Sequence, residues 1–283
     1  MDGRSSRGVS RRAVLRVATG AAAGLVVGEF AYGSLYGRHH LGVTRADVPC
    51  VALPDALDGL RIGLITDTHY SSFTSLQFIE HAVTLLQGEA PDLVVLGGDY
   101  VTLRNRRYIP DAAAPFARLS APQGVFGILG NHDDGIAVPR VLRRAGVAVL
   151  DDARTRLTVR GEVVDLIGVD YWTRRLEDLR RVARGHAPFS ILLAHDPRRL
   201  HEAAALRLPL VLSGHTHGGQ VSMPVIGAIA ARKFPVTEGI GRKGDTSLFV
   251  SRGVGTVLLP CRIDCPPEVA VVTLRRAPAA DLS

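Results

Sequence analysis

The stretch RIGLITDTHY, residues 61–70, decides the fold class, because its apolar half ends directly in two side chains that can bind metal. Residues 62–65 are continuously non-polar, and Asp67 and His69 follow them. A run this short and this apolar is typical of a strand buried on both faces. We therefore expect a central strand whose carboxyl end presents a carboxylate and an imidazole.

The same pattern, an apolar run followed by polar side chains, recurs four more times along the chain. Residues 93–96 precede Asp99, residues 125–129 precede Asn131, His132 and Asp133, residues 191–194 precede His195, and residues 210–212 precede His215 and His217. Five of the ten histidines thus follow apolar runs, which chance placement explains poorly. The carboxyl ends of parallel strands meet at one edge of a sheet, so we expect these side chains to share a crevice.

The segments between these runs have the periodicity of helices. Apolar residues recur at helical spacing within residues 75–86, 138–145, 176–183 and 196–205. Residues 156–172 favour a hairpin with Arg160-Gly161 as its turn, which makes the sheets mixed rather than purely parallel. Strands that alternate with helices predict a layered α/β fold.

The N-terminal residues 1–33 are read separately from the fold. Arg11-Arg12 precedes a stretch rich in alanine and glycine, which resembles a twin-arginine export signal. Its uninterrupted apolar part, residues 17–28, is shorter than the roughly 20 residues that span a bilayer. Residues 31–33 (Ala-Tyr-Gly) form a weak cleavage site, and a retained membrane anchor is the alternative. Either interpretation places the protein at the extracytoplasmic face of the membrane, in the cell wall or in the periplasm, with the twin-arginine export machinery as a partner.

The remaining sequence predicts one domain and excludes some partners. We expect an export signal or anchor over residues 1–33, a linker and lead-in over 34–58, the domain over 59–276 and a tail over 277–283. Five arginines lie in the signal, and the rest of the +7 net charge is spread along the chain. Since aromatic residues make up only 5% of the chain, we expect no nucleic-acid partner. Three cysteines, Cys50, Cys261 and Cys265, are too few for a disulfide framework.

The side chains at the strand ends form a set of metal-binding types without a thiolate. The seven candidates are Asp67, His69, Asp99, Asn131, His195, His215 and His217. Imidazole, carboxylate and amide oxygen suit Mn²⁺, Fe or Zn²⁺. Seven ligands are too many for one tetrahedral ion, but they suit two divalent ions that share a carboxylate. Such a pair attracts phosphate and makes hydroxide available from a bridging water.

Five motifs in this order resemble the calcineurin-like metallophosphoesterase superfamily over residues 60–274. They are Asp67-x-His69, Gly98-Asp99, Gly130-Asn131-His132-Asp133, His195 and Gly214-His215-x-His217. The resemblance implies an α/β sandwich of two mixed β-sheets flanked by α-helices, with a dinuclear site at its edge.

The resemblance also implies a role for each residue. Asp67, His69 and His217 would hold the first metal, Asn131, His195 and His215 the second, and Asp99 would bridge them. His132 would contact the phosphoryl oxygens, as Asn131 also would, and would protonate the leaving group. Asp133 is either an orienting neighbour or a turn residue in solvent.

The closer resemblance is to bacterial exported or membrane-associated phosphodiesterases, which include enzymes that act on lipid pyrophosphates of the cell envelope. It rests on GHTHGGQ (residues 214–220) and on residues 251–274, which contain LPCRIDCPPE. One departure is YVTLRNRR after Asp99, which lacks the Asp-Arg-Gly of protein serine/threonine phosphatases. Phosphoprotein phosphatase activity is therefore not expected, and His132 lacks its usual acidic partner.

Two further segments bear on the substrate. Arg104, Arg106 and Arg107 either bind a second phosphate or form a solvated loop. The apolar residues 223–235 either cover an acyl chain or membrane surface or form a buried hairpin.

The sequence thus predicts a hydrolase of phosphodiester or pyrophosphate bonds that acts at the cell envelope on a phosphorylated small molecule or lipid. The first alternative is a non-catalytic module that binds envelope phosphates or lipids on the same fold. A second alternative, a two-metal amide or ester hydrolase, fits poorly with His132. A serine nucleophile is excluded because Ser213 lies in no G-x-S-x-G turn.

Overall fold

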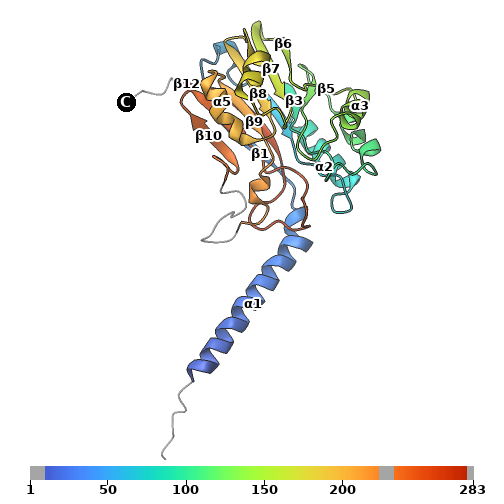
Figure 1. Ribbon diagram of the computed structural model, residues 1–283, viewed down its shortest axis with the longest axis vertical. Helices are drawn as coiled ribbons and strands as arrows, with labels where there is room; N and C mark the ends of the chain where they lie inside the picture. The colour runs from blue at the N-terminus through green and yellow to red at the C-terminus, as the bar shows by residue number, and fades with distance from the viewer. Residues whose placement is uncertain (1–9, 223–232, 279–283) are drawn as a thin grey trace, which may run out of the picture.

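The computed structural model describes residues 10–222 and 233–278 and shows two packed β-sheets with helices on their outer faces (Figure 1). The first six-stranded sheet has the order β1 (Gly42–Val51), β12 (Glu268–Ala277), β2 (Arg61–Ile65), β3 (Leu93–Leu96), β4 (Val125–Gly127) and β5 (Ala148–Val149). The second has the order β10 (Gly239–Lys243), β11 (Thr246–Val250), β9 (Leu210–Ser213), β8 (Phe189–Ala194), β7 (Glu162–Val169) and β6 (Ala153–Val159). The predicted α/β sandwich of two mixed sheets is confirmed.

Each sheet contains a run of four parallel strands and at least one antiparallel pair. Strands β2, β3, β4 and β5 are parallel, and β12 joins them antiparallel to β2. Strands β7, β8, β9 and β11 are parallel, with β6 and β10 antiparallel at the two edges. Every residue of β3, β8 and β9 is buried, as expected for strands covered on both faces.

Three layers of apolar contact hold the sandwich together. Residues such as Leu64, Val95 and Ile191 fill the space between the sheets. The outer face of the first sheet is covered by α2 (Leu76–Gly88) and α3 (Ala137–Arg144), and that of the second by α4 (Leu176–Ala183) and α5 (Leu200–Ala205). Short 3₁₀ turns connect these elements: η1 (Gly37–His39), η2 (Asp55–Leu57), η3 (Ile109–Asp111), η4 (Ala114–Arg118), η5 (Pro197–Arg199) and η6 (His217–Gly219).

The predicted helices and hairpin are present, with one change. The segment 196–205 divides into η5 and α5, because the Asp196 side chain caps the Arg198 N–H and Pro197 begins the turn. Strands β6 and β7 pair antiparallel around Arg160 (φ 51°) and Gly161 (φ 86°), which are both left-handed as in a type I′ turn.

Strand β1 lies within residues 34–58, where the sequence analysis expected a linker. It pairs in parallel with β12 over its whole length and buries Val48 and Cys50 in the core. The other half of the strand is polar and partly exposed, so its sequence gives only a weak strand signal. The fold therefore includes residues from Gly42 onward.

Helix α1 (Arg11–Leu35) leaves the sandwich as a single rod (Figure 1). Its 25 residues at about 1.5 Å each exceed the roughly 30 Å hydrocarbon core of a bilayer. The expectation of a segment too short to cross a membrane is therefore wrong. It counted only residues 17–28, whereas the helix continues through Glu29 and beyond. Length and composition alone support this statement, and a signal sequence meets the same criterion.

The burial of β1 predicts a difference between two neighbouring substitutions. Val48→Ala should lower the free energy of unfolding by about 2 kcal/mol, because it removes two buried methyl groups. Asp47→Ala should cost less than about 1 kcal/mol, since its ion pair with Arg275 is exposed. Urea denaturation measures both, and equal, near-zero effects would show that residues 42–51 are a linker.

Candidate metal centre

The seven candidate ligands meet at one edge of the sandwich. They follow the carboxyl ends of β2, β3, β4, β8 and β9, as expected from the sequence. Six of them form two groups: Asp67, His69 and His217, and Asp99, His195 and His215. Within each group the possible ligand atoms all lie within 4.8 Å of one another.

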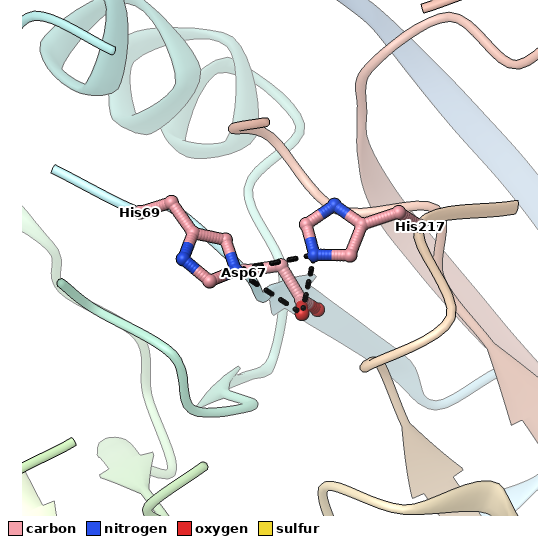
Figure 2. Close-up of side chains that lie close together, drawn as sticks. All are labelled: Asp67, His69 and His217. Carbon is pink, nitrogen blue, oxygen red and sulfur yellow. Dashed lines mark hydrogen bonds and ion pairs between the residues drawn. The ribbon is translucent and has the colours of Figure 1, made fainter. Parts of the chain in front are cut away.

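The first group points three side chains at one position (Figure 2). His69 Nε2 lies 3.1 Å from His217 Nε2, and Asp67 Oδ1 lies 3.2 Å from His217 Nε2 and 4.0 Å from His69 Nε2. Two ring nitrogens and a carboxylate oxygen thus lie within 4.0 Å of one another.

Asp99 lies between the two groups. Its Oδ2 is 3.1 Å from His195 Nε2 in the second group and 3.5 Å from His69 Nε2 in the first. Its Oδ1 accepts a hydrogen bond from the His132 backbone N–H (2.8 Å), which leaves Oδ2 for the centre. This is the position that a bridging carboxylate requires.

Orphaned polar atoms indicate that a cation fits here. His195 Nδ1 lies 2.7 Å from the Gly97 carbonyl and donates to it, so Nε2 is the ring atom left for the centre. His195 Nε2 makes no directed hydrogen bond to Asp99 despite their closeness, and the buried Asn131 Oδ1 has no partner among the described residues. A lone pair facing a carboxylate oxygen is repulsive unless a proton or a cation lies between them.

The electrostatics of the histidines agree with this. Burial lowers the pKa of His69 to about 3 and that of His215 to about 4, so both are neutral near pH 7. Burial also opposes charge on His195, but the carboxylates of Asp99 and Asp67 outweigh it and raise the pKa of His195 to about 10. The two carboxylates therefore favour a positive charge at His195, which a metal ion bound there can supply instead of a proton.

Backbone strain marks the centre independently of side-chain chemistry. Five of the seven candidates adopt left-handed φ values: Asp67 (54°), His69 (44°), Asp99 (57°), His215 (72°) and His217 (54°). Such conformations cost about 1–3 kcal/mol each in residues other than glycine, and they gather at functional sites. They are held by bonds between the loops, for example from the Asp67 N–H to the Gly98 carbonyl (2.9 Å).

The glycines next to the ligands give room. A Cβ on Gly214 would lie 2.2 Å from Asp67 Oδ2, and one on Gly130 would lie 2.1 Å from Asp99 Oδ1. Gly98, before Asp99, and Gly218 and Gly219, after the second histidine, use left-handed φ values of 94°, 60° and 85°. The loops can therefore approach this closely only without side chains at residues 130 and 214.

Asp133 is buried and joins two ligand loops. Its carboxylate accepts hydrogen bonds from the backbone N–H groups of Asp99, Tyr100 and Gly130, each at 2.8 Å. Burial and the charge of Asp99 raise its pKa to about 7. A turn residue in solvent is thus excluded, and Asp133 orients the backbone of the centre rather than the ring of His132.

The missing acidic partner of His132 is replaced by a main-chain group. The Leu103 N–H donates to His132 Nδ1 (2.9 Å), so the neutral ring carries its proton on Nε2. His132 lines the same cavity as Asp99, His215 and His217. The left-handed φ of Leu103, 52°, places this N–H, and the sequence contains no signal for it.

The arginines that follow Asp99 diverge. The Arg104 guanidinium lies over the Trp172 ring at 5.5 Å, and the Arg104 backbone N–H donates to the His132 carbonyl. Arg107 lies over Tyr108 (5.7 Å), and Arg106 lines a separate cavity beside α3. Only Arg104 is therefore held close to His132.

Two kinds of neighbour were not predicted from the sequence. The rings of Tyr171 and Phe234 lie 5.3 and 5.2 Å from the ring of His215.

Arg262 is fully buried, donates to the carbonyls of Arg252 and Gly253, and places Nη2 3.4 Å from His217 Nδ1. The two cysteines of its motif CRIDCPPE, Cys261 and Cys265, are separate buried thiols. Of the apolar residues 223–235, those numbered 223–232 lie outside the described residues.

Two adjoining Asp/His groups at the edge of a two-sheet sandwich are consistent with the dinuclear metal site of a metallohydrolase. The Calcineurin-like phosphoesterase family profile matches residues 60–219. The chain is 31% identical to the metallophosphoesterase YkuE of Bacillus subtilis (strain 168) over 280 residues, which is 94% of this chain and 98% of that protein. It is also 31% identical to phosphodiesterase YaeI of Escherichia coli (strain K12) over 229 residues, 76% and 82% of the two chains.

A third relative is a Danio rerio protein named transmembrane protein with metallophosphoesterase domain. It is 28% identical over 266 residues, which cover 87% of this chain and 60% of that protein. The chain belongs to the calcineurin-like phosphoesterase family, and it is a metallophosphoesterase. The individual roles of the seven ligands stay predictions.

The close approach at Gly214 predicts a selective loss of metal. Gly214→Ala should reduce metal affinity at least about tenfold, because its methyl group displaces the Asp67 carboxylate. Gly135→Ala, in a loop with open space around it, should leave affinity unchanged. Metal content after dialysis, with circular dichroism to check folding, measures this. Full metal content in Gly214→Ala would contradict the role given to Asp67.

The raised pKa of His195 predicts that metal binding displaces a proton. The metal-free protein should hold this proton at pH 7, below the pKa of about 10, and should release about one proton when Mn²⁺ binds. The release should decrease as the pH rises toward 10. Calorimetric titration in buffers of different ionisation enthalpy measures the number, and His195→Asn is the control. Binding without proton release would show that His195 is not a ligand.

Proposed function

We propose that the protein hydrolyses phosphodiester or pyrophosphate bonds through two divalent ions, held by Asp67, His69 and His217 and by Asn131, His195 and His215, with Asp99 between them. The observation that supports this most strongly is the position of Asp99 Oδ2, within 3.5 Å of a ring nitrogen from each group. Mn²⁺, Fe and Zn²⁺ all accept this set of nitrogen and oxygen donors.

The bound ions would supply Lewis acidity and lower the pKa of a bound water. Hydrolysis forms a bond from phosphorus to the water oxygen, breaks the bond to the leaving oxygen, and gives that oxygen a proton. His132 presents its Nε2–H toward the cavity, where it donates a hydrogen bond to a phosphoryl or leaving oxygen. Arg104, whose backbone N–H donates to the His132 carbonyl, and Arg107, whose guanidinium lies over Tyr108, are the candidates for contact with a second phosphate.

We also propose that the protein acts at the extracytoplasmic face of the membrane. The support is the apolar helix α1, which begins at the Arg11-Arg12 pair. A pair of arginines before an apolar segment is the pattern of an export signal that the twin-arginine machinery recognises. The relative from Danio rerio, named as a transmembrane protein, is consistent with a membrane-associated form.

A non-catalytic phosphate- or lipid-binding module is the second candidate. Such a module tolerates loss of ligands, whereas all seven predicted ligands are present here, six of them lie in the two groups, and the buried Oδ1 of Asn131 has no partner among the described residues. Hydrolysis of amides or esters is less well supported, since it leaves the neutral donor on His132 without a phosphoryl oxygen to contact.

Turnover of bis(4-nitrophenyl) phosphate by the Mn²⁺-loaded protein tests the proposal. His132→Gln should lower kcat by about 10²- to 10⁴-fold and leave metal content unchanged, because it removes a donor to the reacting group and no ligand. Asp99→Asn should lower both kcat and metal content.

His201→Gln, an exposed histidine on α5, is the matched control and should behave as the parent. A protein that is loaded with metal but turns over no phosphodiester, phosphomonoester or pyrophosphate would favour the non-catalytic module instead.

A further inference from the structure

An apolar groove adjoins the metal centre. Its volume is about 670 Å³, and its lining includes Asp99, His132 and His217 on the side of the centre. The rest of its lining is mostly apolar and includes Phe234, Val257, Leu258 and Leu259. A small, hydrophilic phosphoester would not fill such a groove, because it has no hydrocarbon to place against these side chains.

The two leucines on the rim of the groove are exposed and fixed in place. Leu258 and Leu259 are 67% and 53% exposed. Gln220 holds their loop: its Nε2 donates to the carbonyls of Val257 (3.0 Å) and Leu259 (2.9 Å), and its Oε1 accepts from the Val257 N–H (2.8 Å). Since Gln220 follows His217 by three residues, the exposed leucines are rigidly connected to the metal centre. Neighbouring exposed apolar side chains of this kind mark a surface that contacts something apolar.

Helix α1 ends on the same loop. The Arg262 N–H donates to the Gly33 carbonyl (3.1 Å), and a Cβ on Gly33 or Gly37 would lie 2.8 or 2.3 Å from the Arg262 carbonyl oxygen. A second bond, from Arg38 Nη1 to the Phe73 carbonyl (3.0 Å), holds the helix end against the domain. Figure 1 shows α1 leaving the sandwich beside this orange-red loop. The contact buries Gly33, which belongs to the weak cleavage site at residues 31–33.

The contacts between the end of α1 and the loop of Arg262 determine on which side of the domain the groove lies relative to α1. If α1 crosses a bilayer, the loop that carries Leu258 and Leu259 lies at the bilayer surface, because Arg262 of that loop binds the end of the helix. Lys233, which also lines the groove, places a positive charge beside Phe234 (5.1 Å), where an anionic headgroup would lie.

We propose that α1 is retained as a membrane anchor and that the groove receives the hydrocarbon chain of a phosphorylated membrane lipid. The phosphoester of this lipid then reaches the metal centre without leaving the bilayer surface. This inference rests on the proposed function and adds the substrate class and the site that selects it.

Two phosphodiesters with the same leaving group test the inference: 4-nitrophenyl methyl phosphate in solution and 4-nitrophenyl hexadecyl phosphate in phosphatidylcholine vesicles. We expect the full-length, Mn²⁺-loaded protein to hydrolyse the hexadecyl ester with a kcat/KM at least about tenfold higher, because only this ester fills the groove. The Leu258→Asp/Leu259→Asp variant should lose this ratio. Aspartate adopts the left-handed φ of residue 258 (60°) more readily than leucine, so the change adds no backbone strain.

Val163→Asp is the matched control, because Val163 is 43% exposed on β7, beside the turn that joins β6 to β7, and it does not line the groove. It should keep the parent ratio. If the protein hydrolyses neither ester, the proposed function itself is overturned. Two results would overturn the lipid groove alone: hydrolysis of both esters with no preference for the long chain, or a preference that the double variant keeps. Either result would leave a protein partner as the alternative for this surface.

The retained anchor is tested by intact-mass spectrometry of the protein from the membrane fraction of expressing cells. We expect a mass that includes α1. A mature form that begins after Gly33 would overturn the anchor.

Discussion

The repulsion between two buried carboxylates, Asp67 and Asp99, is the constraint on which the rest of the structure depends. Neither has a lysine or arginine side chain as ion-pair partner among the described residues. Of the neighbouring imidazoles, burial keeps His69 and His215 neutral near pH 7, whereas His195 holds a proton between the two carboxylates. Buried charges of one sign are stable only when opposite charge lies close by. A pair of cations satisfies this requirement, and the same cations explain why a phosphoester is the natural substrate.

The scaffold maintains this unfavourable arrangement through its main chain. Parallel strands from both sheets end at one edge, and their loops are held together by the Asp133 carboxylate and by left-handed residues. Glycines at 130 and 214 allow the loops to approach. On the other side, Gln220 and Arg262 connect the centre to the exposed leucines and to α1, so the catalytic edge and α1 have a fixed relation.

Much of this could be predicted from the sequence, because buried central strands have a clear apolar signal and ligands follow them directly. The layered α/β fold, its helices and the gathering of the side chains that form the two Asp/His groups were predicted in this way, whereas the sandwich of two mixed sheets was implied by the family resemblance. Strand β1 could not be, since half of it is polar and its pairing with β12 is long-range. Leu103 positions His132 through its backbone N–H, and Arg262 is held by backbone carbonyl groups. Neither interaction can be predicted from the type of residue at these positions. The length of α1 was underestimated because Arg16 and Glu29 bound its apolar run without ending the helix.

The most direct test of this account is anomalous diffraction at the Mn absorption edge from crystals of the Mn²⁺-loaded protein. The account predicts two peaks, about 3.5–4 Å apart, one among Asp67, His69 and His217 and the other among Asn131, His195 and His215, with Asp99 between them. A single peak, or none at this edge of the sandwich, would contradict it.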